Sequence, residues 1–191
     1  MIDRLEVSFE RVLAGLTQNL YADEQFTLRL RGEVSQFTRF NHAKVRQTGI
    51  VRDGSLQLKL ISQQRSSSVE FPFTGDSEID LPQAQAALAG LRLEVPQLPI
   101  DPYLVLPTGN ATSHEVHAGE LLPDAQVVSS LLPGVNNLDF TGLYAAGMVL
   151  RGYADSSGQK HWFAAESYTL DYSLFTSTEQ AVKGTLAGSH W

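Results

Sequence analysis

The sequence predicts an α+β fold in which one or more antiparallel sheets carry helices packed on one face. Three observations favour this class: an amphipathic helical pattern opens the chain, apolar and polar residues alternate over residues 25–73, and alternation returns after residue 139. The chain has 191 residues, of which 42% are hydrophobic, so it can bury a sizeable core. We expect two subdomains, residues 1–95 and 96–191.

The first subdomain should open with a helix and continue into strands. Apolar residues recur three and four positions apart through residues 2–20, which is the spacing of one helical face. Alternation then predicts strands over residues 25–31 and 35–41, with Gly32 ending or bending the first of them.

An antiparallel meander should follow these strands. Asp-Gly pairs favour tight turns because both residues tolerate positive φ, so a hairpin turn is predicted at Arg52-Asp53-Gly54, between strands 44–51 and 55–62. A further strand is expected around residues 69–73. The core face should bury Leu28 and Leu58. The residues expected to be solvated are Arg29, Arg31 and Lys59.

A second helix should complete the first subdomain. Residues 83–92 are rich in Ala and Leu, and Pro82 suits a first helical turn. Asp80 or Ser77 is the predicted N-cap, and Pro96 should stop the helix.

The second subdomain should consist of a connector, short helices and a second set of antiparallel strands. Four prolines within residues 95–107 predict an extended connector. Helices are expected at 114–122 and 124–132, and strands at 143–153, 159–175 and 181–191, with a turn at 155–158.

The composition excludes several classes of function. The chain has no cysteine, so it has no disulfide, no thiolate metal site and no cysteine nucleophile. Charged residues in the first 20 positions argue against a signal peptide, and no apolar run is long enough to span a bilayer. We therefore expect a protein that is not exported and has no membrane partner.

Charge is distributed unevenly along the chain. Residues 1–65 hold ten of the 14 Lys and Arg residues and carry a charge of +3, whereas residues 66–191 carry −10. Such asymmetry can mark a nucleic-acid partner, but here the cations alternate with apolar residues, as on any solvated strand face. A nucleic-acid partner is therefore not expected. The cations concerned are Arg29, Arg31, Arg39, Lys44 and Arg46.

One histidine cluster could carry chemistry. His114 and His117 could share a helical face with Glu120, which would supply material for a hydrolase with its own metal site. A helical zinc-protease motif instead spaces its histidines four apart, and Ala118 stands at that position. A solvated helix start is the simpler interpretation, so we assign no catalytic and no metal-binding residue.

Glycines spaced about five apart mark the segment after residue 139. They could be bends within a sheet, or they could let a peptide or a partner strand approach the backbone. In the second interpretation, residues 143–158 and a nearby aromatic lie at a contact surface. The candidate peptide or subunit contact residues are Gly142, Gly147, Arg151, Gly152 and Trp162.

Two segments carry more specific motifs. In residues 33–47, Arg39-Phe40-Asn41 leads into Lys44-Val45-Arg46-Gln47, and in residues 139–162 a glycine-rich run leads into Asp155-Ser156-Ser157-Gly158-Gln159. These segments resemble the TldD/PmbA family, in which the second motif usually begins with Asn in place of Asp155. Both residues serve turns. The resemblance covers most of the chain and is weakest over residues 64–130.

The resemblance implies a cytoplasmic system that processes unfolded peptides. The family includes zinc metalloproteases and zinc-free partner subunits, historically named modulators of DNA gyrase. Its zinc site is similar to His-Glu-x-x-x-His with a later cysteine, and neither feature occurs here, because Gly119 follows His114-Glu115 at the position the second histidine would take. We therefore expect an N-terminal portion that is inactive alone and holds no cofactor, with zinc only in a C-terminal protease domain or a partner subunit.

The resemblance also implies partners. We expect a homodimer, or a heterodimer with a TldD/PmbA paralogue, that binds unfolded peptide substrates. The alternative function is a module that interacts with nucleic acid or with DNA gyrase, which would use the basic half of the chain.

Overall fold

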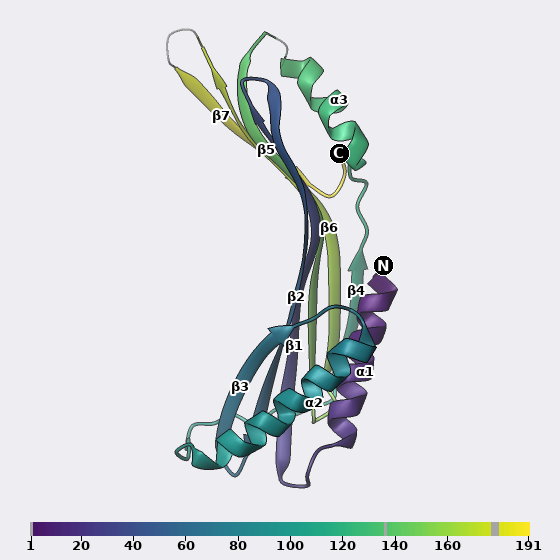
Figure 1. The fold of residues 1–191 in the computed structure, drawn as a ribbon, viewed down its shortest axis with the longest axis vertical. Helices are drawn as coiled ribbons and strands as arrows, with labels where there is room; N and C mark the ends of the chain where they lie inside the picture. The colour runs from purple at the N-terminus through teal and green to yellow at the C-terminus, as the bar shows by residue number, and fades with distance from the viewer. Residues whose placement is uncertain (1, 136, 177–179) are drawn as a thin grey trace. The chain divides into compact units, whose positions relative to one another are not determined.

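The computed structural model describes residues 2–135, 137–176 and 180–191, and it confirms the α+β class. Seven strands form an antiparallel sheet in the order β3-β2-β1-β5-β6-β4, with β7 paired to β6 (Figure 1). The strands are β1 Glu24–Asn41, β2 Lys44–Ser62, β3 Arg65–Pro72, β4 Thr112–His117, β5 Asp139–Asp155, β6 Lys160–Phe175 and β7 Ala181–Gly188. The α-helices are α1 Ile2–Gln18, α2 Ser77–Glu94 and α3 Val127–Leu131. None of the described helices is long and apolar enough to cross a membrane.

The chain divides into two compact units that are discontinuous in sequence. Unit 1 comprises residues 1–32, 53–115 and 150–163, and unit 2 comprises residues 33–52, 116–149 and 164–191. The predicted boundary near residue 95 therefore falls inside unit 1 and does not separate the units. The physical reason is that four long strands, β1, β2, β5 and β6, each contribute residues to both units, which no single cut in the sequence reproduces.

The strands are longer than the sequence predicts. Gly32 lies inside β1, so it does not end that strand, and Asp53-Gly54 lies inside β2, so the expected hairpin turn is wrong. Gly54 instead allows a close backbone approach, because a Cβ there would lie 2.8 Å from the carbonyl oxygen of Phe73. The turn that joins β1 to β2 is His42-Ala43, with φ values of 49° and 50°. The turn that joins β2 to β3 is Gln63-Gln64, with φ values of 50° and 57°.

Unit 1 buries an apolar core between α1, α2 and the strands. The helical spacing predicted for α1 places Phe9, Val12 and Leu16 inside, and alternation along β1 and β2 does the same for Leu28 and Leu58. Arg29 and Arg31 are exposed as predicted, whereas Lys59 is half-buried.

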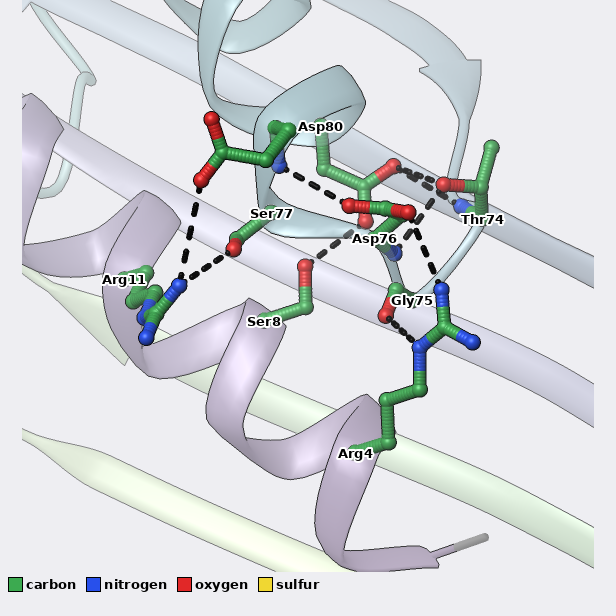
Figure 2. Close-up of polar contacts among 9 residues, drawn as sticks. Arg4, Ser8, Arg11, Thr74, Gly75, Asp76, Ser77 and Asp80 are labelled. Atoms are coloured by element: carbon green, nitrogen blue, oxygen red, sulfur yellow. Dashed lines mark hydrogen bonds and ion pairs between the residues drawn. The ribbon is translucent and has the colours of Figure 1, made fainter.

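A buried polar cluster joins α1 to the start of α2 (Figure 2). The carboxylate of Asp80 is fully buried and accepts a hydrogen bond from the Ser8 hydroxyl at 2.7 Å. Its other oxygen accepts from the Thr74 amide at 2.8 Å and from the Thr74 hydroxyl at 2.9 Å. Asp80 thus satisfies polar groups of α1 and of the loop before α2, which makes it a structural residue of the core.

The N-cap of α2 is Asp76, not Asp80 or Ser77. The Asp76 side chain accepts a hydrogen bond from the amide of Glu78 at 3.1 Å, which satisfies one of the unpaired donors at the helix start. Arg4 of α1 binds Asp76 at 3.0 Å, so the cap is also held to the first helix (Figure 2).

Unit 2 has its own core, beneath α3. Phe40, Phe140, Tyr144 and Leu170 from three strands pack with Val127 of α3. The predicted helix over 124–132 is present only in part, as α3 flanked by two 3₁₀ turns, Asp124–Gln126 and Leu132–Val135. The sheet of this unit ends on one side at β7, which pairs with β6 from Tyr168↔Gly188 to Phe175↔Ala181.

Candidate contact surface

The sheet face of unit 2 that lies opposite the α3 core is open. Strand residues alternate between faces, so the neighbours of Phe40 and Tyr144 in sequence point away from that core. They border a groove of about 640 Å³. Its lining includes Glu33, Ser35, Phe37 and Arg39 of β1, Gln47 and Val51 of β2, and Thr141, Gly142, Leu143 and Ala145 of β5.

Phe37 and Leu143 are two of the apolar side chains that line this groove. A Cβ at Gly49 would lie 2.6 Å from the Phe37 ring, so the glycine leaves room for the ring to lie across β2. Leu143 is 41% exposed although it lies on a central strand. Exposed apolar side chains within a groove that also holds charged groups are typical of surfaces that bind polypeptide.

Cationic side chains line the end of the same face near the β1–β2 turn. Arg39 and Arg46 border a second cavity, of about 330 Å³, together with Gln47. Both arginines are exposed, and neither forms an ion pair with any residue in the described part of the chain.

The five cations grouped by the sequence do not belong to one unit. Arg29 and Arg31 lie in unit 1, whereas Arg39, Lys44 and Arg46 lie in unit 2. No single described unit therefore presents all five as one basic patch, which weakens the basis for a nucleic-acid module.

Of the five predicted contact residues, Gly142 and Gly147 lie in unit 2. Gly142 belongs to the lining of the groove. Gly147 has an internal role, because a Cβ there would lie 2.3 Å from the carbonyl oxygen of Val34 and 2.4 Å from the Cα of Ser35. Its missing side chain lets β1 and β5 approach each other closely.

The other three, Arg151, Gly152 and Trp162, lie in unit 1. Arg151 is exposed, but Gly152 is buried, and a Cβ there would lie 3.2 Å from the ring of Phe9. Trp162 was expected at a surface, yet it is only 4% exposed and packs against Phe9 with ring centroids 5.9 Å apart. Furthermore, β5 has strands on both sides, β1 and β6, so it offers no edge for the strand addition that its glycines suggested.

The histidine cluster does not lie on a helix. His114 and His117 are on strand β4, where residues three apart point to opposite faces, so the predicted helical face does not exist. His114 instead contacts Glu6 of α1 at 3.0 Å. In the described part of the chain, no group of three or more His, Asp or Glu side chains is arranged to hold a metal ion.

The turn of the second sequence motif is organised by Asp155. This carboxylate is 4% exposed and accepts hydrogen bonds from the Ser157 amide at 2.9 Å, the Ser157 hydroxyl at 2.6 Å and the Tyr153 hydroxyl at 3.0 Å. Burial alone would raise the pKa of Asp155, but these bonds, with one from the Gln159 amide, outweigh burial and hold its pKa below the ordinary value.

Substitution of Asp155 should reveal this network. Asp155→Ala should lower the free energy of unfolding by about 2 kcal/mol, because it leaves the part-buried donors of Tyr153 and Ser157 without their acceptor. Asp155→Asn keeps an acceptor oxygen and should cost about half as much. Because the folded pKa is lowered, the advantage of the wild type over Asp155→Asn should be complete above the unfolded pKa, about 4, and should vanish as the pH falls through the folded pKa. Urea denaturation of all three proteins between pH 2.5 and 7 measures this, and a pH-independent difference would contradict it.

Comparison with known proteins identifies the fold. No family model and no curated protein matches the sequence. Among solved structures, the chain is similar to TldE from Thermococcus kodakarensis, with a TM-score of 0.68 and 10% identity over 95% of this chain and 43% of that one. It is also similar to a candidate modulator of a DNA gyrase from Thermotoga maritima, with a TM-score of 0.64 and 10% identity over 95% of this chain and 42% of that one. A candidate gyrase modulator from Bacteroides thetaiotaomicron matches with a TM-score of 0.56 and 14% identity over 98% and 45% of the two chains.

At these identities the likeness establishes the fold. It agrees with the resemblance to the TldD/PmbA family carried by residues 33–47 and 139–162, so that prediction is confirmed at the level of architecture. The chain spans less than half the length of each of these three solved structures.

Proposed function

We propose that this chain, which has the fold found in TldE, is the N-terminal substrate-binding and subunit-contact portion of a TldD/PmbA-type protein. The observation that carries the proposal is the pattern of coverage: the structural match includes 95% of this chain but only 43% of TldE. A portion of that size leaves room elsewhere in such a protein for a catalytic domain. Cytoplasmic localisation and a paralogous partner subunit belong to the same proposal.

The open face of unit 2 is the proposed contact surface. Its groove combines the Phe37 ring and the exposed Leu143 side chain with polar side chains such as Gln47, on the exposed surface of three neighbouring strands. An unfolded peptide or an extended segment of a partner subunit presents the same mixture of backbone and side-chain groups, so this surface suits both occupants.

Catalysis is not assigned to this chain. It lacks cysteine and the spacing His-Glu-x-x-x-His, so it cannot supply the zinc ligands of the family's active subunit. We propose that zinc, where a TldD/PmbA-type assembly uses it, is bound by a C-terminal domain or by a partner subunit.

Binding and cleavage of an unfolded protein test this proposal together. Reduced, alkylated casein labelled with a fluorophore should bind the chain, as measured by anisotropy, and should remain uncut in the presence of Zn²⁺. Leu143→Asp should weaken binding at least tenfold without changing the melting temperature, because Leu143 is already exposed. Leu93→Asp is the matched control, since Leu93 is 75% exposed on α2 in unit 1.

Three outcomes would contradict the proposal. Zinc-dependent cleavage by the purified chain would show a catalytic site of its own. Absence of casein binding would remove the substrate-binding role. Equal weakening by Leu143→Asp and Leu93→Asp would show that binding is not located on the open face of unit 2.

A further inference from the structure

Among the described strands, none pairs with the outer edge of β2 over residues 44–52. The partner strand β3 pairs with β2 only from Ser55↔Pro72 to Ser62↔Arg65, which leaves the preceding part of β2 without a neighbour on that side. In the described part of the chain, no backbone or side-chain group from outside the sheet donates to or accepts from these residues. At about 3.3 Å per residue, the free edge is roughly 30 Å long.

A free edge of this length offers a regular row of hydrogen-bonding groups. In an edge strand every second residue directs its amide and its carbonyl away from the sheet. The segment contains no proline, which would remove a donor, so the row is complete from Lys44 to Arg52. Such a row is the template on which an extended polypeptide adds as a further strand.

The side chains along the edge add two kinds of recognition. Ile50 is 63% exposed, and Val45 is also exposed, so apolar contacts are offered beside the backbone. Lys44, Arg46 and Arg52 are exposed and form no ion pair with any described residue. An added strand would therefore meet three positive charges that no described ion pair neutralises, although Asp124 borders the same cavity as Arg52.

Self-pairing of this edge with the same edge of a second copy does not satisfy these charges. Antiparallel self-pairing about Thr48 would place Lys44 opposite Arg52, and like charges opposite each other destabilise a strand pair. The other edge strand of unit 2, β7, carries Lys183 and no carboxylate, so it is not complementary either. Charge complementarity thus favours an added segment that carries several Asp or Glu residues over a second copy of β2 or β7.

We propose that residues 44–52 of β2 take an extended, acidic segment of another polypeptide as an added strand. The backbone row supplies affinity, Lys44, Arg46 and Arg52 select carboxylates, and Ile50 contacts an apolar side chain of the incoming strand. This inference rests on the proposed contact function and names the chemistry of the polypeptide that binds.

A charge-reversal pair tests the selection of acidic segments. The probe is a fluorescein-labelled ten-residue peptide of alternating Glu and Thr, compared with a peptide of alternating Lys and Thr. The Glu peptide should bind the wild type, and Arg46→Glu/Arg52→Glu should weaken it at least tenfold and create binding of the Lys peptide. The matched control is Arg29→Glu/Arg31→Glu, which reverses two exposed cations of β1, a strand paired on both sides, and should change affinity less than twofold.

A backbone readout separates strand addition from simple charge attraction. Amide exchange measured by NMR should show new protection at every second residue of 44–52 when the Glu peptide is bound. Two N-methylated versions of the Glu peptide, one methylated at its odd-numbered and the other at its even-numbered residues, complete the test. The version whose methyl groups face β2 should not bind, whereas the version whose methyl groups face away from β2 should bind normally. Binding of both methylated peptides would overturn the proposal. Protection of backbone amides only outside residues 44–52 would overturn it as well.

The remaining outcomes distinguish this inference from the proposed function. If casein binds but the Glu peptide does not, the acidic-strand inference is wrong and the contact function stands. The same conclusion follows if Arg46→Glu/Arg52→Glu and the β1 control lower the affinity for the Glu peptide equally. If neither casein nor the peptide binds, both are wrong. A dimer in sedimentation velocity that Arg46→Glu/Arg52→Glu disrupts would identify a second copy as the occupant and overturn the inference.

Discussion

Replacing Gly147 with valine should prevent unit 2 from folding, or lower its free energy of unfolding by about 4 kcal/mol. The Cβ of any residue at this position would lie 2.3 Å from the Val34 carbonyl oxygen and 2.4 Å from the Ser35 Cα, and both atoms belong to the backbone of β1. Backbone atoms in a paired central strand cannot move aside as a flexible side chain can. Gly147→Ala should therefore be nearly as damaging as Gly147→Val.

Denaturant unfolding and NMR spectra of the two Gly147 variants measure this effect. Gly90→Ala is the control, because nothing lies within 4 Å of the position that its Cβ would occupy, and it should stabilise α2 by about 0.5–1 kcal/mol. A Gly147→Val protein that keeps its stability and loses only peptide or subunit binding would contradict the structural role and restore the contact role expected from the sequence.

Asp80→Ala should lower the free energy of unfolding by about 3 kcal/mol, the second large effect. The substitution removes the acceptor of three hydrogen bonds, which leaves the buried Ser8 hydroxyl unpaired and deprives the part-buried Thr74 amide of its partner (Figure 2). Because Ser8 lies on α1 and Asp80 on α2, the loss should loosen the packing of these two helices.

A double-mutant cycle with Ser8→Ala isolates the pair. Ser8→Ala alone should cost less than Asp80→Ala, since Asp80 keeps its bonds from Thr74. The two substitutions together should cost about 1 kcal/mol less than the sum of their separate effects, because they share one hydrogen bond. Strict additivity, measured by urea denaturation, would contradict the assigned bond.

Much of the fold could be predicted from periodic patterns. The apolar spacing of residues 2–20 predicts α1 within two residues of its observed end, and the alternation at Leu28 and Leu58 predicts which face of the sheet is buried. These elements follow local rules, since one face of each is covered and the other is solvated.

The errors arise where glycine has two uses. At Gly32 the sequence allows a strand end and at Asp53-Gly54 it predicts a turn, but both glycines lie inside strands and leave room for neighbouring groups, Leu150 in one case and the Phe73 carbonyl in the other. The observed turns use His42-Ala43 and Gln63-Gln64, whose side chains do not signal positive φ. The positions of these glycines and turns depend on how closely segments distant in sequence approach each other. No local sequence pattern predicts that approach.

The candidate surface was located only partly by the sequence. The motif of residues 33–47 contains Phe37, Arg39 and Gln47, which line the groove, but it marks them only as part of a resemblance. Leu143 opens the contact segment predicted over residues 143–158, but the residues singled out there were mainly glycines, because an apolar residue in a strand is normally assigned to the core. The free edge of β2 was hidden by the predicted turn at Asp53-Gly54, which placed residues 44–51 inside a hairpin.

Amide hydrogen exchange of the chain with and without reduced, alkylated casein locates the surface that binds unfolded polypeptide. We expect casein to protect the strands of unit 2 that border the open face, including residues 33–39 and 44–52, and to leave α1 and α2 of unit 1 unchanged. Protection confined to unit 1, or an exchange pattern that casein does not alter, would contradict the assignment of unit 2 as the surface that binds unfolded polypeptide.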